Sequence, residues 1–400
     1  MRIALFTDTC FPTVNGVARA LGLLVDHANA AGHEVALVSP DLGAPHPGVA
    51  FQVRLPGVTL PFYRELKAAR PWMGARDADV LEAFAPDVVH VATEALVGSV
   101  GRRWARARGI PLITSFCTNF PDYLSGYHMG FAEEACWSWL RRFHAAADLT
   151  VCPSHATRKD LAERGFHERL KIWGRGVDAE LFHPSRRDPA LRASMAPDAE
   201  VVLLYVGRIA PEKKVELLVE AFPEIRARSE KTVALVFVGG GPALEPLRER
   251  APEGVHFAGY QRGEALARHY ASADVFLFGS DTETFGQVVT EALSSGLPVV
   301  APARGGVTDT VIPGETGFLF EPGNARALAD HAVRLVNDDA LRERIGARAR
   351  EMARARSWAA VFETLFRDYA EACAGRYGAV TDTSDDRRAV GATLGAEARR

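Results

Sequence analysis

Two glutamates at a fixed separation are the residues whose setting most clearly indicates chemistry. Glu283 and Glu291 have seven residues between them in the stretch DTETFGQVVTEALSSGLPVVAPARGGVTDTVIPGETG, residues 281–317. Apolar neighbours surround Glu291, and a carboxylate in such a setting is costly unless hydrogen-bond donors satisfy it. Hydroxyl groups of a bound molecule are suitable donors, and the amides of Phe285 and Gly286 at the start of the expected helix can face an anion. The competing interpretation is a pair of solvated glutamates on a surface helix.

Positive charge gathers in a second loop. The segment VGRIAPEKK, residues 206–214, follows an apolar run and contains Arg208 and Lys213. A guanidinium and an ammonium group in one loop can bind a diphosphate, and each charge-assisted contact contributes about 1.5–3 kcal/mol. A solvated charged turn is the alternative, and Lys214 fits that description.

Two further loops place glycine after an expected strand. The opening segment FTDTCFPTVNG ends at Gly16, where a helix is expected to begin and where the helix dipole favours phosphate. Gly240 belongs to GGGP, residues 239–242, which either lines a nucleotide site or forms a tight turn. The first loop lacks the G-x-G-x-x-G spacing, which argues against a nicotinamide site.

These motifs follow short apolar runs that alternate with helical stretches. Runs rich in valine, isoleucine and leucine predict strands covered on both faces, as in parallel sheets. The expected strands are Ile3–Phe6, Val35–Val38, Val88–Val91, Leu112–Phe116 and Leu149–Val151, and then Val201–Val206, Val233–Val238, Val255–Phe257, Val275–Phe278 and Pro298–Ala301. The sequence therefore predicts an α/β fold of two doubly wound, Rossmann-like parallel-sheet units, which bind ligands at the carboxyl ends of their strands.

A segment rich in proline and charge, residues 182–200, separates the two units. We expect an N-terminal domain over residues 1–185 and a second domain over residues 186–355. A helix over residues 356–377 is expected to cross back to the first domain. The polar tail, residues 378–400, is expected to be disordered because it is poor in apolar residues.

The combination of motifs resembles the retaining glycosyltransferases of family four, which have the GT-B fold of two Rossmann-like domains facing across a cleft. The resemblance extends over about residues 1–375. It implies that the N-terminal domain, residues 1–185, is the acceptor domain and that residues 186–355 form the nucleotide-sugar domain. It implies that Glu283 contacts the donor sugar and that Glu291 contacts the ribose. It also implies that Arg208 and Lys213 bind the diphosphate and stabilise the leaving group.

The same resemblance gives expectations for the rest of the donor site. The loop that ends at Gly16 would lie against the diphosphate from the other side of the cleft. The segment VHFAGY, residues 255–260, matches the part of the family whose backbone contacts the base, which makes Tyr260 a donor-side candidate.

The acceptor side is expected in TSFCTNFPDY, residues 114–123. This segment is similar to the corresponding segment of lipid- and mannose-transferring members of the family, which have a histidine at the position of Cys117. The cysteine leaves open an altered specificity or a reduced activity. Asn119, Asp122 and Tyr123 either face the acceptor or form a capped turn.

Within the family, the resemblance favours an α-mannosyltransferase that uses GDP-mannose and a lipid, glycolipid or other saccharide acceptor. UDP-glucose and UDP-sulfoquinovose are alternative donors. A nucleotide-sugar epimerase and a catalytically silent nucleotide-sugar-binding protein are alternative classes. Same-face attack would require neither a protein nucleophile nor a cofactor.

Composition excludes several other classes. A net charge of −3 gives no support for nucleic-acid binding, and five scattered cysteines suit a reducing cytoplasm rather than a zinc cluster. Asp77 and Asp79 lie at an expected helix start, where aspartates commonly cap, so no metal is expected. Segments 60–72, 102–108 and 137–142 mix aromatic with basic residues and either contact a membrane surface or are ordinary exposed helix residues.

Overall fold

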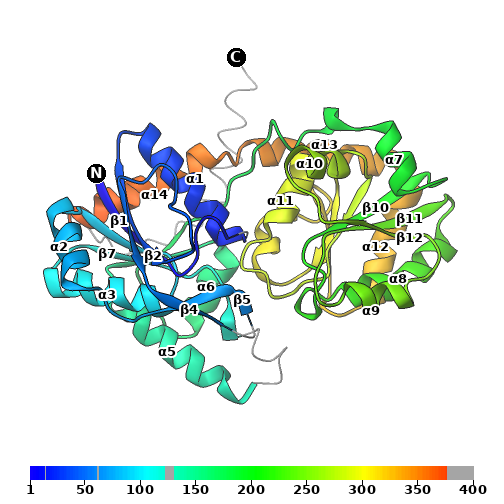
Figure 1. Ribbon diagram of the computed structural model, residues 1–400. Helices are drawn as coiled ribbons and strands as arrows, with labels where there is room; N and C mark the ends of the chain where they lie inside the picture. The colour runs from blue at the N-terminus through cyan, green and yellow to red at the C-terminus, as the bar shows by residue number, and fades with distance from the viewer. Residues whose placement is uncertain (14, 61–62, 122–129, 376–400) are drawn as a thin grey trace.

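The computed structural model describes residues 1–13, 15–60, 63–121 and 130–375. Two lobes lie side by side, each built around a parallel sheet with helices on its faces (Figure 1). The expectation of an α/β chain with two doubly wound, Rossmann-like units is confirmed. The expected disordered tail lies outside the described residues.

The first lobe contains a seven-stranded sheet in which the paired strands are parallel. In spatial order its strands are β3 (Phe51–Leu55), β2 (Glu34–Pro40), β1 (Arg2–Phe6), β6 (Val88–Val91), β7 (Leu112–Ser115), β8 (Leu149–Cys152) and β9 (Leu170–Ile172). Its helices are α1 (Gly16–Ala30), α2 (Ala75–Phe84), α3 (Leu96–Arg108), α5 (Glu133–Ala145) and α6 (His155–Glu163), and a hairpin joins β4 (Gly57–Leu60) to β5 (Tyr63–Ala69). The strand order reverses between β1 and β6, which opens a crevice at the carboxyl edge.

The second lobe repeats this plan with six strands. In spatial order they are β12 (Val255–Gly259), β11 (Val233–Val238), β10 (Val201–Val206), β13 (Val275–Leu277), β14 (Val299–Pro302) and β15 (Gly317–Phe320). Its helices are α7 (Pro189–Met195), α8 (Val215–Arg228), α9 (Leu244–Arg250), α10 (Gly263–Ala271), α11 (Gln287–Ser294), α12 (Ala325–Asn337) and α13 (Asp339–Arg354). Here the order reverses between β10 and β13, so the loops after these two strands flank the crevice.

The last helix returns to the first lobe. Helix α14 (Trp358–Cys373), coloured orange-red in Figure 1, contributes Phe362 and Leu365 to the same buried apolar cluster as Ile3 of β1. The Tyr369 hydroxyl lies 2.5 Å from Nδ1 of the buried His90 in β6. The final helix therefore packs on the first sheet, whereas α13 packs on α11.

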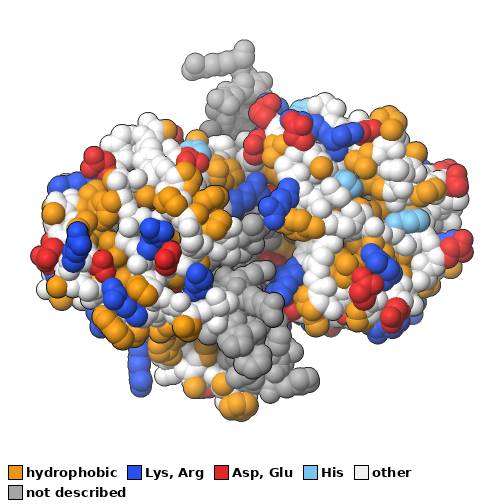
Figure 2. All heavy atoms as spheres, in the orientation of Figure 1, with side chains coloured by type: hydrophobic (Ala, Val, Ile, Leu, Met, Phe, Trp, Pro, Cys, Tyr) orange, Lys and Arg blue, Asp and Glu red, His pale blue; other side chains and the backbone are white. Residues whose placement is uncertain are grey.

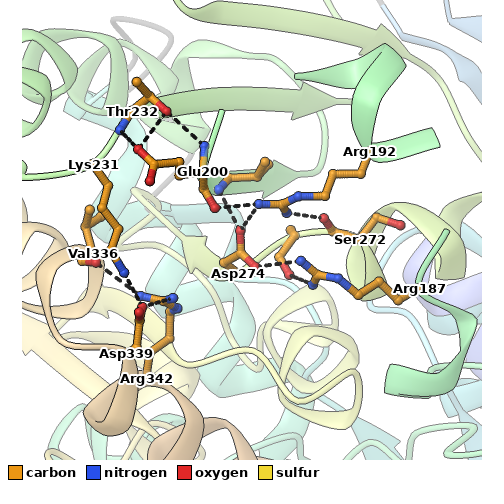
Figure 3. Close-up of polar contacts among 12 residues, drawn as sticks. Arg187, Arg192, Glu200, Lys231, Thr232, Ser272, Asp274, Val336, Asp339 and Arg342 are labelled. Carbon is orange, nitrogen blue, oxygen red and sulfur yellow. Dashed lines mark hydrogen bonds and ion pairs between the residues drawn. The ribbon is translucent and has the colours of Figure 1, made fainter. Parts of the chain in front are cut away.

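The segment between the lobes is attached to the second sheet. Asp274, directly before β13, accepts hydrogen bonds from the Arg187 side chain at 3.0 Å and from the Val202 backbone amide at 2.7 Å (Figure 3). Arg192 of α7 pairs with the same carboxylate at 2.7 Å. Residues 187–200 thus join the second lobe, although the sequence indicated only a linker there. The domain boundaries at residues 185 and 355 stay predictions.

Candidate active site

Two loops of the second lobe meet where its strand order reverses. The β10 loop carries Lys213 and the β13 loop carries Glu283, and the two side chains form an ion pair. Each of these side chains is about one-fifth exposed, at 18% and 19%. A second ion pair, between Lys214 and Asp281, joins the same two loops. The lysine and the glutamate with expected catalytic roles therefore lie together at the carboxyl edge of the sheet.

Arg208 belongs to the same loop but is more exposed. Its guanidinium lies 3.6 Å from the Glu212 carboxylate, and its side chain is 45% exposed. The buried Tyr205 hydroxyl donates a hydrogen bond to the Arg208 carbonyl at 2.9 Å, and burial raises the pKa of this hydroxyl. The strand thus anchors the backbone of the loop while the arginine side chain remains able to reach a ligand.

The loop around Glu283 is held through its backbone. The Gly306 amide donates to the Glu283 carbonyl at 2.7 Å, and a Cβ at Gly305 would lie 2.4 Å from that oxygen. Gly286, with φ of 87°, begins α11 in the left-handed region that favours glycine. Phe285 has a buried side chain, so only its backbone amide can face an anion at the helix start.

Glu291 lies about one turn into α11 and is almost fully buried. Its Oε1 accepts a hydrogen bond from Arg19 of α1 at 2.8 Å, and its Oε2 lies 3.3 Å from the Tyr270 hydroxyl. Burial raises the pKa of Glu291, while the Arg19 guanidinium opposes this effect. The second glutamate of the pair is therefore a buried carboxylate that is contacted from the opposite lobe.

The glycine loop after β11 packs on the loop after β10. A Cβ at Gly239 would lie 1.9 Å from the Gly207 carbonyl oxygen, and one at Gly241 would lie 2.3 Å from the Ile209 oxygen. Gly240 has open space around its Cβ position, and its carbonyl accepts a hydrogen bond from the Ile209 amide at 2.9 Å. Gly240 can thus lie beside a ligand.

The first lobe supplies the facing loops. Cys117 follows β7; its sulfur accepts a hydrogen bond from Arg175 at 3.3 Å, and its carbonyl accepts one from Thr284 Oγ1 of the second lobe at 2.9 Å. Burial raises the pKa of the Cys117 thiol, and Arg175 lowers it. The side-chain oxygen of Asn119 is buried and has no hydrogen-bond partner within the described part of the chain. Asp122 and Tyr123 lie outside the described residues.

Two donor-side candidates lie apart from this group. Gly16 is exposed as the first residue of α1, whose N-terminus is capped by Asn15 Oδ1 accepting from the Ala18 amide at 2.8 Å. Tyr260 follows the edge strand β12 and is 60% exposed, with the Arg262 guanidinium 4.9 Å from its ring centre. The strand order thus places Tyr260 farther from Glu283 than Lys213 is.

Sequence reasoning missed several buried polar residues at the first carboxyl edge. Asp8 accepts hydrogen bonds from the amides of Val97 and Gly98 at the start of α3, at 2.8 and 3.3 Å, and burial raises its pKa. Glu94 is also buried, with its carboxylate 3.4 Å from His144 Nε2. Sequence reasoning also missed Arg19. A basic residue one turn after Gly16, which ends the loop expected to face a diphosphate, could have indicated it.

No group of three or more potential metal ligands occurs within the described ranges. Asp77 instead accepts a hydrogen bond from the Gly74 amide at 3.2 Å at the start of α2, which confirms the expected cap. None of the described helices has the length and apolar character needed to span a bilayer. Lys and Arg side chains, blue in Figure 2, flank the junction of the lobes.

Two Rossmann-like lobes whose switch-point loops face each other form the GT-B fold. The chain belongs to glycosyltransferase family 4: the model described as Glycosyltransferase Family 4 matches residues 14–181, and that described as Glycosyl transferases group 1 matches residues 187–352. The chain is therefore a glycosyltransferase.

Relatives and solved structures agree with this assignment. A GDP-mannose-dependent alpha-mannosyltransferase of Mycolicibacterium smegmatis is 40% identical, with 94% of this chain and 98% of the relative covered. Sulfoquinovosyl transferase SQD2 of Arabidopsis thaliana is 34% identical, with 90% and 71% covered. The fold is that of sucrose-phosphate synthase from Thermosynechococcus elongatus, with a TM-score of 0.75 at 22% identity and coverage of 94% and 99%.

Proposed function

We propose that this glycosyltransferase transfers mannose from GDP-mannose to a lipid or glycolipid acceptor, with retention of the α configuration. The observation that carries the donor is the similarity, at 31–40% identity over 94% of this chain, to three proteins named GDP-mannose-dependent alpha-mannosyltransferase. The convergence of Lys213, Glu283 and Glu291 at the second switch point supports a donor site there.

The donor would occupy the carboxyl edge of the second sheet. Glu291 accepts hydrogen bonds from ribose hydroxyls, and Glu283 contacts hydroxyls of the sugar. The amides of Phe285 and Gly286, the backbone at Gly240 and the segment before Tyr260 complete this side. Gly16 lets the first lobe approach the diphosphate.

Arg208 and Lys213 would offset the negative charge that grows on the departing diphosphate. The acceptor hydroxyl attacks the face from which the diphosphate leaves and transfers its proton to the leaving phosphate. Closure of the lobes excludes water from this step. Cys117 takes no covalent part, because burial raises the pKa of its thiol and keeps it protonated.

The acceptor would approach along the first lobe, beside Cys117 and Asn119. Helix α5 exposes Trp139 at 44%, and Phe131 before it is 87% exposed. Arg102 of α3 donates to the Arg142 carbonyl at 3.1 Å and lies over the ring of Phe143, which packs against Trp139. This surface suits the cytoplasmic face of an anionic membrane that holds a lipid acceptor.

UDP-sulfoquinovose and UDP-glucose are the second candidates, because the relatives include sulfoquinovosyl transferase SQD2 and alpha-monoglucosyldiacylglycerol synthases. The decisive experiment incubates the full chain with radiolabelled GDP-mannose, UDP-glucose or UDP-sulfoquinovose and a bacterial lipid extract. Lipid-soluble label from GDP-mannose alone supports the proposal. Label from a UDP-sugar alone assigns the other donor, and interconversion or binding without transfer contradicts both.

A further inference from the structure

One ion pair of the donor site joins the two lobes. Arg19 belongs to α1 of the first lobe, and its Nη1 lies 2.8 Å from Glu291 Oε1 of α11 in the second. The Glu291 side chain is only 3% exposed, whereas that of Arg19 is 44% exposed. A molecule that reaches this carboxylate from the cleft must therefore approach alongside the Arg19 guanidinium.

We propose that Arg19 is a positioning residue of the donor site, supplied by the first lobe, which holds the Glu291 carboxylate ready for the ribose of a nucleoside diphosphate. This inference rests on the proposed donor site and adds to it a residue on which nucleotide binding across the cleft depends. The proposed role of Arg19 does not depend on which sugar is transferred or on which acceptor receives it.

The hydrogen bonds at Glu291 fix its orientation. Arg19 holds Oε1 from α1, and the Tyr270 hydroxyl of α10 holds Oε2 at 3.3 Å. An ionised carboxylate has about four acceptor sites, so these two bonds leave acceptor capacity for ribose. Removal of Arg19 would leave a buried carboxylate without its cation, which is costly unless the carboxylate takes up a proton.

The charged and polar groups around Glu291 make nucleotide binding depend on pH in a way that tests the role of Arg19. Burial raises the pKa of Glu291, and the charge and hydrogen bond of Arg19 lower it, as do hydrogen bonds from Tyr270 and from Gln287 of its own helix. On α13, which packs against α11, Arg350 instead donates to the carbonyl of Ser294 at 2.7 Å, at the last residue of α11 and three residues beyond Glu291. Loss of Arg19 thus raises the pKa of Glu291 further, and protonated Glu291 accepts weaker hydrogen bonds from ribose.

Calorimetry with GDP and with UDP tests the proposal on the full chain. Between pH 7 and pH 9 the terminal phosphate, with a pKa of about 6, is already ionised and does not obscure the result. We expect Arg19→Ala to weaken nucleotide binding about tenfold at pH 7, or about 1.4 kcal/mol, and to regain affinity as the pH rises. Arg19→Lys, which keeps the charge, should recover most of the affinity. Arg228→Ala, which breaks a surface pair with Glu224 and Asp330, is the matched control and should bind as the unmodified chain does.

Glu291→Gln distinguishes a failure of the proposed donor site from a failure of the proposed role of Arg19. Unchanged nucleotide affinity in Glu291→Gln would contradict the proposed donor site itself. If Glu291→Gln weakens binding but Arg19→Ala does not, only the role of Arg19 is wrong. In the double variant, Arg19→Ala should cause no further loss, and an additional tenfold loss there would show that Arg19 does not act through Glu291.

Discussion

Lys213 and Glu283 lie 70 residues apart in the chain and form an ion pair at the switch point of the second sheet. In the proposed donor site, the diphosphate would lie near this ammonium group and the sugar near this carboxylate. The carboxylate of Glu283 offsets the charge of Lys213 in this ion pair, so a bound diphosphate would compete with Glu283 for the ammonium group.

Lys213→Ala should lower kcat more than it raises KM. The charge that Lys213 faces grows as the sugar–phosphate bond breaks, so its stabilisation is greatest in the transition state. A fall in kcat of about 10²–10³-fold is expected, measured by initial rates with the active donor. Lys231→Ala, which removes a lysine paired with Asp339 away from the site, is the control. A rise in KM at constant kcat would assign Lys213 to binding alone.

Cys117→Ala should keep kcat/KM within about tenfold, or about 1.4 kcal/mol in the barrier. The thiol accepts a hydrogen bond from Arg175, but burial raises its pKa and keeps it protonated, and same-face transfer gives it no covalent step. Intact mass of the enzyme held with donor alone should show no added sugar. Cys136→Ala, a partly buried thiol of α5, is the control. A glycosyl adduct on Cys117, or a loss beyond a thousandfold, would make the thiol a participant in the reaction.

Gly240→Ala and Gly239→Ala should separate ligand contact from folding. A Cβ at Gly240 meets open space, so that variant should melt at an unchanged Tm yet bind nucleotide about tenfold more weakly, because the methyl group occupies space beside the ligand. Gly239 has φ of 144° and its Cβ would overlap the Gly207 carbonyl. Strain and overpacking each cost about 1–3 kcal/mol, so Gly239→Ala should melt at a clearly lower Tm. Undiminished nucleotide binding in Gly240→Ala would remove that residue from the site.

Activity should persist after treatment with EDTA. Arg208 and Lys213 supply positive charge for the diphosphate in the proposed donor site, and Asp77 is engaged in a helix cap. The measurement is transfer rate before and after chelation and dialysis, with equal ionic strength. Loss of activity that Mg²⁺ or Mn²⁺ restores would show that the aspartates of α2, or other carboxylates, bind a required metal.

The sequence allowed the two sheets and most of their strands to be predicted, because buried parallel strands are continuous apolar runs. Val88–Val91, Val201–Val206 and Val233–Val238 were predicted to the residue. The edge strands β3, β9 and β15 were not predicted. Leu170–Ile172 has only three residues and includes a lysine, so it carries little of that signal.

The candidate site was predictable only where its residues lie in one loop or on one helix. Glu283 and Glu291 share a segment, and Arg208 and Lys213 share another. The pairing of Arg19 with Glu291 joins residues 272 positions apart, and that of Asp8 with Val97 joins residues 89 apart. Such contacts depend on how the lobes and loops are placed in space, which no local pattern encodes.

The return of the last helix means that the chain passes between the lobes twice, once before α7 and once between α13 and α14. The two passages touch: the Val177 amide donates to the Arg356 carbonyl at 2.9 Å, and a Cβ at Gly176 would lie 2.4 Å from the Trp358 nitrogen. Because the two connections adjoin, they restrain the lobes at one place. This arrangement favours a hinge rotation about that place over sliding or separation of the lobes. Rotation about such an axis would return the same residues of the two lobes to the same contacts each time the lobes closed.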